Sequence, residues 1–161
     1  MAKEDTASEL NLTRERMVQL LNEDLSREYQ AIIAYVVYSQ VIKGAEYTDI
    51  ARELEKHAGE ELTHAIKIAK QVDYLGGKPV VIPQPVKTSL DPVEMLRADL
   101  ENEQVTIANY RQRIRQAEAM GEFALSETLR EIIVQEQEHE IDLCDALGID
   151  VPPPAKVAVI G

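Results

Sequence analysis

The chain has 161 residues, 29% of them charged, with a net charge of −12 and a single cysteine, Cys144. This length is enough for one domain with a sizeable core. The acidic balance argues against nucleic acid as a partner, because nucleic acids bind basic faces. One cysteine excludes an intrachain disulfide, and no apolar run approaches the roughly 18 residues of a membrane span. We therefore expect a cytoplasmic protein that does not bind a membrane.

Apolar residues recur every three or four positions in four long stretches, a spacing typical of amphipathic helices. The first stretch covers residues 13–43 and stops at Gly44. The second begins near Thr48, which we interpret as its N-cap, and ends at Gly76.

The third and fourth stretches also have boundary signals. Asp91 is a good N-cap, Pro92 suits the first helical position, and Glu94 would complete a capping box. This helix is predicted to end before Gly121, and the fourth helix is predicted to cover residues 122–147.

The links between these stretches differ in length. The first and last links are only a few residues long, which predicts two antiparallel hairpins. The middle link, GGKPVVIPQPVKTSLD, contains three prolines that favour an extended path. At about 3.3 Å per residue it can reach roughly 50 Å, more than the length of a helix of about 28 residues.

The sequence therefore predicts an all-α four-helix bundle of two antiparallel hairpins joined by a long crossover. We assign this domain to residues 13–148, between an N-terminal segment (residues 1–12) and a Pro-rich tail (residues 149–161).

Each helical stretch carries one glutamate inside its apolar stripe, about halfway along the helix. The stripes are Leu21, Leu25, Ile32 and Val36 around Glu28; Ile50, Leu54, Ala65, Ile68 and Val72 around Glu61; Leu96, Leu100, Ile107 and Ile114 around Glu103; and Leu125, Leu129, Ile133 and Leu143 around Glu136. At 1.5 Å per residue, each glutamate lies about 20 Å from the start of its helix. The four carboxylates should therefore converge at one level of the core.

A buried cluster of four carboxylates needs compensating positive charge. Each unpaired buried ion costs several kcal/mol, and like charges repel one another. Lysine and arginine are mostly absent from these stripes near mid-height, whereas two divalent cations would balance the four carboxylates. His64 and His139 follow Glu61 and Glu136 by three residues, so each pair lies on one helix face. Carboxylate and imidazole ligands without a thiolate favour iron or manganese.

The second half of the chain repeats the first. Glu28 and Glu103 are 75 residues apart, and the same offset relates Glu61 to Glu136, His64 to His139 and Tyr35 to Tyr110. A fixed offset predicts two related hairpins around a pseudo-twofold axis. Each hairpin would then supply one glutamate and one Glu-x-x-His pair to the centre.

These residues resemble the ferritin-like di-iron carboxylate proteins, and among them bacterioferritin. The resemblance covers roughly residues 11–149 and rests on the segments LNEDLSREYQAIIAY, EELTHA, PVEMLRADLENE and IIVQEQEHEID. It implies two iron ions per chain, bridged by Glu61 and Glu136. It further implies that Glu28 with His64, and Glu103 with His139, are the terminal ligands, and that Tyr35 lies beside the ferroxidase site as a catalytic residue.

The chain also departs from the bacterioferritin pattern. Bacterioferritins bind haem through a methionine just after the second-helix glutamate; Leu62 stands there, so haem is not expected. The family's inner-surface histidine corresponds to Lys56. Its neighbour His57 is expected at the surface or at a subunit interface rather than as an auxiliary metal ligand. Glu60 and Glu140 fit either an iron path or a solvated helix face, and the Pro-rich tail takes the place of the family's short fifth helix.

The resemblance implies a ferroxidase that oxidises ferrous iron with O2 or peroxide and stores it in a homo-oligomer, such as a 24-subunit cage. Two other functions stay open from the residues: a non-storing di-metal redox enzyme similar to the rubrerythrin peroxidases, and a structural bundle that binds metal. Thr106 stands where rubrerythrins carry an additional glutamate, and the sequence has no Cys-x-x-Cys pair.

Overall fold

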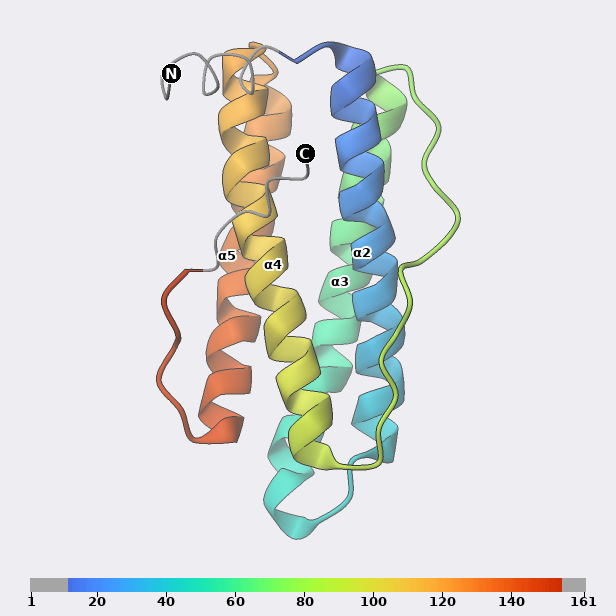
Figure 1. The fold of residues 1–161 in the computed structure, drawn as a ribbon. Helices are drawn as coiled ribbons and strands as arrows, with labels where there is room; N and C mark the ends of the chain where they lie inside the picture. Colours follow the sequence, from blue (N-terminus) through green and yellow to red (C-terminus); the bar gives the residue numbers. More distant parts are fainter. Residues whose placement is uncertain (1–11, 155–161) are drawn as a thin grey trace, which may run out of the picture.

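Four long helices make up the protein in the computed structural model, which describes residues 12–154. They are α2 (Arg14–Val41), α3 (Thr48–Tyr74), α4 (Pro92–Ala119) and α5 (Phe123–Leu147), with a 3-10 turn, η1 (Ala45–Tyr47), before α3. α2 pairs with α3 and α4 with α5; α3 also faces α5, and α2 faces α4 (Figure 1). Residues 12–154 contain no strand, and the predicted all-α bundle is confirmed. Residues 1–11 of the predicted N-terminal segment and 155–161 of the predicted tail lie outside the described residues.

The starts of α2 and α4 carry side-chain caps, of which the sequence indicated the one at Asp91. At α2, the hydroxyl oxygen of Thr13 accepts a hydrogen bond from the N–H of Arg16 at 3.1 Å. At α4, the carboxylate of Asp91 accepts from the N–H of Val93 at 2.9 Å, and Pro92 is the first helical residue. Both caps satisfy an N–H group that has no partner within its helix.

At the N-termini of α4 and α3, the structure differs from the prediction in two details. Glu94 acts through Ser89, whose hydroxyl accepts from the N–H of Asp91 at 3.0 Å and donates to Glu94 at 2.7 Å. The predicted direct contact of a capping box, from Glu94 to the N–H of Asp91, is thus replaced by a contact through the hydroxyl of Ser89. The assignment of Thr48 as an N-cap is wrong, because η1 brings the chain into helical geometry one residue earlier. Tyr47 takes the N-cap position without a side-chain cap.

Helices α4 and α5 stop at glycines with positive φ, 75° at Gly121 and 66° at Gly148. Glycine adopts this region without the steric cost that a Cβ brings. Beyond Gly148, the N–H of Ile149 donates to the carbonyl of Cys144 at 3.0 Å and closes the end of α5. The predicted stops therefore have a local backbone cause.

The link between α3 and α4 runs along the outside of α2 (Figure 1). Asn22 of α2 donates to the carbonyl of Lys78 at 2.9 Å and accepts from the N–H of Val80 at 2.8 Å. One turn further, Ser26 donates to the carbonyl of Ile82 at 2.6 Å. Because this extended link returns the chain to the opposite end of the bundle, α4 runs parallel to α3, as the crossover prediction requires.

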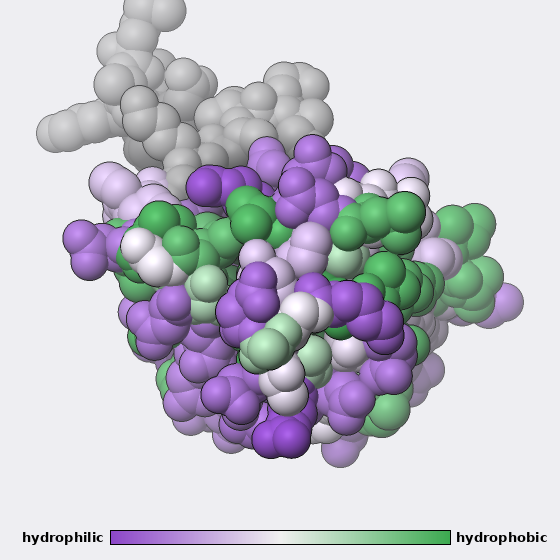
Figure 2. Space-filling view, turned by 90° about the horizontal axis from the view of Figure 1, so that it is seen from below, coloured by the Kyte–Doolittle hydropathy of each residue, from purple (hydrophilic) through white to green (hydrophobic). Residues whose placement is uncertain are grey.

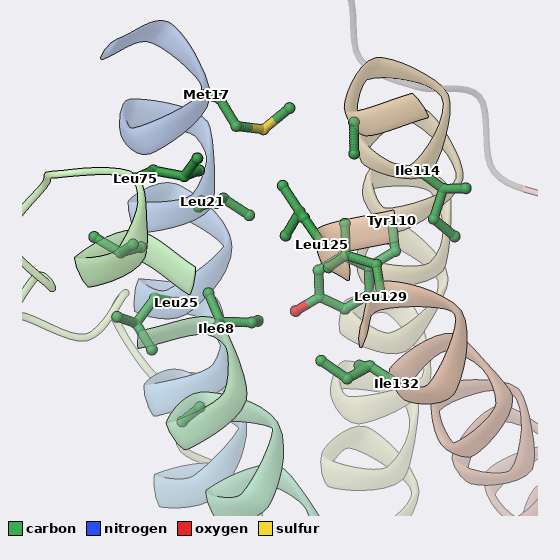
Figure 3. Close-up of a cluster of buried hydrophobic side chains, with 13 residues drawn as sticks. Met17, Leu21, Leu25, Ile68, Leu75, Tyr110, Ile114, Leu125, Leu129 and Ile132 are labelled. Carbon is green, nitrogen blue, oxygen red and sulfur yellow. The ribbon is translucent and has the colours of Figure 1, made fainter. Parts of the chain in front are cut away.

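Two hydrophobic clusters fill the bundle, and a polar layer lies between them. The first cluster, shown in Figure 3, includes Met17, Leu21, Leu25, Ile68, Val72, Tyr110, Ile114, Leu125, Leu129 and Ile132; the second includes Tyr35, Tyr38, Leu54, Met95, Leu96, Leu100, Leu143 and Cys144. Along each helix, the core glutamate falls between residues of the two clusters. Hydrocarbon therefore encloses the carboxylates from both ends of the bundle.

One residue of the predicted stripes does not lie in the core. Val36 is 51% exposed, because its neighbour Tyr35 points inward at this turn of α2 instead. Ile32 and Ile133 are only partly buried against the first cluster. Cys144 is buried, as expected of a small core residue.

Seen from the end that carries the α2–α3 link and the start of α4, the surface is largely hydrophilic with separate hydrophobic groups (Figure 2). Among the described helices, none is long and apolar enough to cross a membrane.

The start of the crossover provides a test of the packing. A Cβ added to Gly77 would lie 2.3 Å from Cγ1 of Val18 on α2. We expect Gly77→Ala to lower the free energy of unfolding by about 1–3 kcal/mol, because the link or Val18 must shift. Gly59→Ala is the control: Gly59 is exposed on α3, and its added Cβ meets no atom within 4 Å. This control should gain about 0.5–1 kcal/mol. Urea unfolding followed by circular dichroism measures both, and equal stability of the two variants would contradict the tight contact at Gly77.

Candidate metal centre

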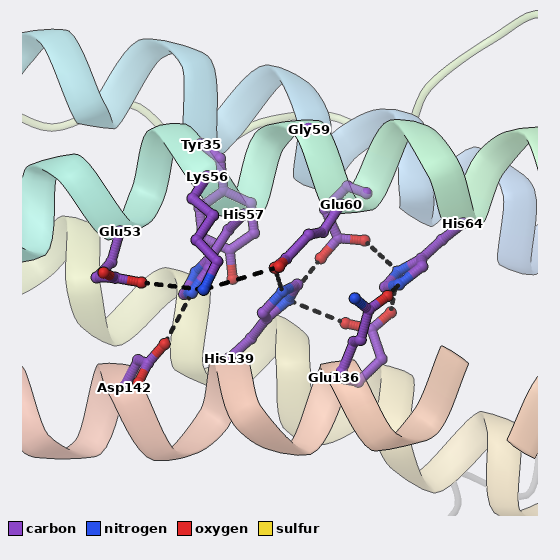
Figure 4. Close-up of polar contacts among 12 residues, drawn as sticks. Tyr35, Glu53, Lys56, His57, Gly59, Glu60, His64, Glu136, His139 and Asp142 are labelled. Atoms are coloured by element: carbon purple, nitrogen blue, oxygen red, sulfur yellow. Dashed lines mark hydrogen bonds and ion pairs between the residues drawn. The ribbon is translucent and has the colours of Figure 1, made fainter. Parts of the chain in front are cut away.

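The polar layer brings the six predicted ligands together. They come from all four helices: Glu28 from α2, Glu61 and His64 from α3, Glu103 from α4, and Glu136 and His139 from α5. The most accessible of them, Glu103, is only 3% exposed. Figure 4 shows part of this layer, where side chains of α3 and α5 point toward one another.

His64 directs its Nδ1 atom at three carboxylates. The Nδ1 atom lies 3.1 Å from Oε2 of Glu61 and 3.3 Å from Oε1 of Glu136. Oε2 of Glu28 is 3.7 Å away.

His139 makes the equivalent contacts from the other hairpin. Its Nδ1 atom lies 3.0 Å from Oε1 of Glu61, 3.3 Å from Oε2 of Glu136 and 3.6 Å from Oε1 of Glu103. Glu61 and Glu136 thus present one oxygen to each histidine, whereas Glu28 and Glu103 each approach only one. Two positions result, each surrounded by three glutamates and one histidine whose ligand atoms lie within 4.8 Å of one another.

Buried polar atoms without hydrogen-bond partners concentrate in this layer. Of the nine such side-chain atoms among the described residues, six belong to the four glutamates and His139. Buried oxygen and nitrogen atoms normally have partners, so cations would satisfy atoms that the protein itself does not. Carboxylate oxygens and imidazole nitrogens form a donor set that fits iron or manganese.

Burial and the close approach of like and opposite charges also shift the pKa values of the groups in this layer. Burial opposes the charge of each histidine, but the surrounding carboxylates raise the pKa of His64 and His139 well above the usual range. Burial also opposes the charge of Glu103, yet the hydrogen bond and charge of His139 lower its pKa to about 2. Burial and the charges of Glu103 and Glu28 raise the pKa of Glu136 to about 8. Without metal, the layer therefore holds protons that metal ions would displace.

Two buried tyrosines connect the halves. Tyr35 donates a hydrogen bond to Oε1 of Glu103, and Tyr110 donates to Oε1 of Glu28. Burial and the nearby carboxylates raise the pKa of both phenols, so both remain hydrogen-bond donors. The family resemblance implied a site role for Tyr35, and Tyr110 was identified only as its partner in the repeat. The repeat was the signal that could have predicted the matching contact of Tyr110.

His57 is buried, so its expected surface or interface position is wrong. It is 1% exposed, and its ring stacks on that of His139 with a centroid distance of 4.0 Å. Its Nε2 atom lies 3.0 Å from Oδ2 of Asp142 on α5. His57 stands three residues after Leu54 and four before Glu61, so the helical spacing of α3 was a signal that could have placed it on the core face.

The Nε2 atoms of the two inner histidines have partners outside the layer. His64 contacts Oε1 of Gln135, and His139 contacts Oε2 of Glu60, both at 2.7 Å. Gln135 was missed by the sequence reasoning, although it lies 75 residues after Glu60. For Glu60 and Glu140, the sequence fitted either an iron path or a solvated helix face. In the structure Glu60 is partly buried and Glu140 is buried, so neither side chain is freely solvated.

A buried ion pair joins α2 to α4 near the layer. Arg113 donates to both carboxylate oxygens of Asp24, at 2.8 and 3.3 Å. Asp99 stands at the corresponding place in the repeat and is also buried, but Tyr38 occupies the place that corresponds to Arg113. The repeat is therefore close for the six inner residues and weaker around them.

A family model of the ferritin-like domain matches residues 18–148. The chain belongs to the ferritin-like family. Its relatives include the bacterioferritin of Brucella melitensis, 23% identical over 140 residues that span 83% of this chain and 87% of the relative. The bacterial ferritin of Neisseria meningitidis serogroup B is 32% identical over 87 residues, which span 54% of this chain and 56% of that protein.

Two solved structures resemble this ferritin-like chain. One is a ferritin-like di-iron carboxylate protein of Bacillus anthracis, with a TM-score of 0.80 and 32% identity over 83% of this chain and 96% of the other. Another is a dodecameric thioferritin, the bacterioferritin-related protein of Bacteroides fragilis, with a TM-score of 0.79 and 28% identity over 90% and 93%. Both similarities agree with the predicted family.

Divalent metal should stabilise this ferritin-like protein, because ions that bind the folded layer and not the unfolded chain shift the equilibrium toward the folded state. At a free Co2+ concentration of about 100 times Kd, the expected stabilisation is about 2.7 kcal/mol for each metal position that fills. Thermal unfolding with and without Co2+ should show that Glu61→Ala loses most of the rise in Tm. Glu101→Ala, changed at an exposed position of α4, should keep it. Equal rises in both variants would mean that the ions bind elsewhere.

Proposed function

We propose that this ferritin-like protein is a ferroxidase, which oxidises ferrous iron in the buried layer and stores iron inside a homo-oligomeric shell. The observation that carries the proposal is the contact pattern of Glu61 and Glu136, which divide their oxygens between the two histidines. Such a pattern suits two substrate ions side by side, with one terminal glutamate and one histidine for each.

The charge of the layer supports oxidation. Four carboxylates balance two ferrous ions, four negative charges against four positive ones. Oxidation adds two positive charges, and the carboxylates stabilise this increase because the surroundings are dry and strengthen electrostatic interactions. Two ferric ions carry six positive charges, which the four carboxylates do not balance. This excess charge favours the departure of ferric iron with hydroxide toward a mineral.

The proposed reaction balances with either oxidant. Two ferrous ions lose one electron each, and O2 takes both electrons and two protons to give hydrogen peroxide. With peroxide as oxidant, two electrons and two protons break the O–O bond and give two water molecules. Tyr35 would hold Glu103 in place during the reaction through its hydrogen bond.

Storage requires a shell of several copies. The Bacteroides fragilis relative is described as dodecameric, and we propose a closed homo-oligomer for this chain, of that size or up to the 24-subunit cage. Haem is not part of the proposal, since Leu62 replaces the methionine expected of a haem ligand. We retain a cytoplasmic location, in line with the single cysteine.

Iron oxidation provides the direct test. The purified protein should oxidise anaerobically loaded Fe(II) rapidly when O2 or peroxide is added, as followed by ferric absorbance and oxidant consumption. Glu136→Ala should slow the reaction by on the order of 100-fold, because it removes an oxygen from both positions. Glu138→Ala, two residues away and exposed, should oxidise iron at the wild-type rate. Rapid oxidation by Glu136→Ala would place the reaction elsewhere, and peroxide turnover without mineral growth would favour the peroxidase function.

The storage function is tested by size. Native mass measurement and light scattering should find a closed assembly at least as large as a dodecamer, whose mass rises on iron loading. A species no larger than a dimer would contradict storage, while the oxidation experiment would still decide ferroxidase activity.

A further inference from the structure

The two halves of the metal centre differ in the groups behind the histidines. The Nε2 atom of His64 lies 2.7 Å from the amide oxygen of Gln135, and that of His139 lies 2.7 Å from a carboxylate oxygen of Glu60. Glu60 and Gln135 are 75 residues apart, so they occupy equivalent places in the repeat. The geometry is the same on both sides, and only the chemistry of the acceptor differs.

The acceptor affects the histidine as a ligand. Each histidine turns Nδ1 toward the inner carboxylates, so Nε2 carries the hydrogen and donates it outward. A hydrogen bond to an ionised acceptor is roughly twice as strong as one to a neutral acceptor. A carboxylate behind a ligating imidazole also raises the basicity of that imidazole. His139 is therefore the stronger electron donor of the two.

Other neighbours of Glu60 and His139 further distinguish this side of the centre. Its Oε2 atom faces His139, while its Oε1 atom lies 3.9 Å from Nζ of Lys56, as Figure 4 shows. The side chain of Glu60 is 21% exposed, so it is partly shielded from water. His57 covers one face of His139, whereas Ile132 stands at the corresponding place in the repeat.

We infer that Glu60 is a positioning residue that makes the two metal positions unequal. The position formed with Glu103 and His139 binds a divalent ion more tightly, and stabilises the ferric state more, than the position formed with Glu28 and His64. Two nearly symmetric hairpins would thus produce an ordered filling of the centre. This inference rests on the proposed di-iron site and goes beyond it, because the inner ligands alone predict equal positions.

Variants that lack one terminal ligand separate the two positions. Glu28→Ala retains the position with His139, and Glu103→Ala retains the position with His64. Co2+ binding is then measured in each by calorimetry and by the visible absorption of the bound ion, without iron or oxidant. We expect the Glu28→Ala protein to bind Co2+ on the order of tenfold more tightly than the Glu103→Ala protein.

Exchanging the outer acceptors then tests the cause. Glu60→Gln should weaken Co2+ binding about tenfold and shift the absorption bands in the Glu28→Ala background, with little effect in the Glu103→Ala background. Gln135→Glu should act in the opposite direction and only in the Glu103→Ala background. Combining both exchanges should reverse the order of affinities while the number of each residue type stays the same.

The outcomes are distinct. Equal affinities of the two positions, or an effect of Glu60→Gln that is the same in both backgrounds, would overturn the inference but leave the proposed ferroxidase intact. No Co2+ binding by the wild-type protein would overturn both. Thermal unfolding of the metal-free variants shows whether a change in affinity follows from a loss of folding; the reversed order in the double exchange cannot arise in that way.

Discussion

The burial of four carboxylates in one layer is the constraint on which the rest of this structure depends. An unpaired buried ion costs several kcal/mol, and here four carboxyl groups lie close together between two hydrophobic clusters. In the metal-free chain, protonated histidines and two tyrosine hydroxyls supply the compensation. The atoms that remain without partners are those that metal ions would satisfy. The instability of the layer without cations is thus the physical basis of its affinity for them.

The crossover link decides which helices meet. Two hairpins of this kind could pair in several ways, but the link along α2 starts α4 at the same end of the bundle as α3 (Figure 1). As a result α3 faces α5, and α2 faces α4. The two Glu-x-x-His pairs therefore oppose each other across the layer. The terminal glutamates do the same, each held by a tyrosine of the opposite hairpin.

The repeat and its departures have different consequences. The inner residues are repeated closely, which accounts for two similar positions with shared oxygens. Around them the halves differ: Glu60 matches Gln135, and within residues 12–154 the Asp24–Arg113 pair has no equivalent ion pair at Asp99. A nearly symmetric framework can thus give two ions of the same element different surroundings. In a reaction that takes one electron from each ion, the two ions then need not behave alike.

The sequence by itself determined the four helices, most of their ends and the set of six inner residues, because helical periodicity, capping chemistry and distance along a helix are local properties. It also predicted a need for cations, since that expectation follows from charge and burial. Only the tertiary structure decided that the ring of His57 stacks on that of His139, that Val36 faces outward, and that Gln135 and Glu60 lie behind the histidines. These contacts depend on how neighbouring helices are rotated and offset against one another. That relation arises from side-chain packing across the bundle, and the pattern of a single helix does not contain it.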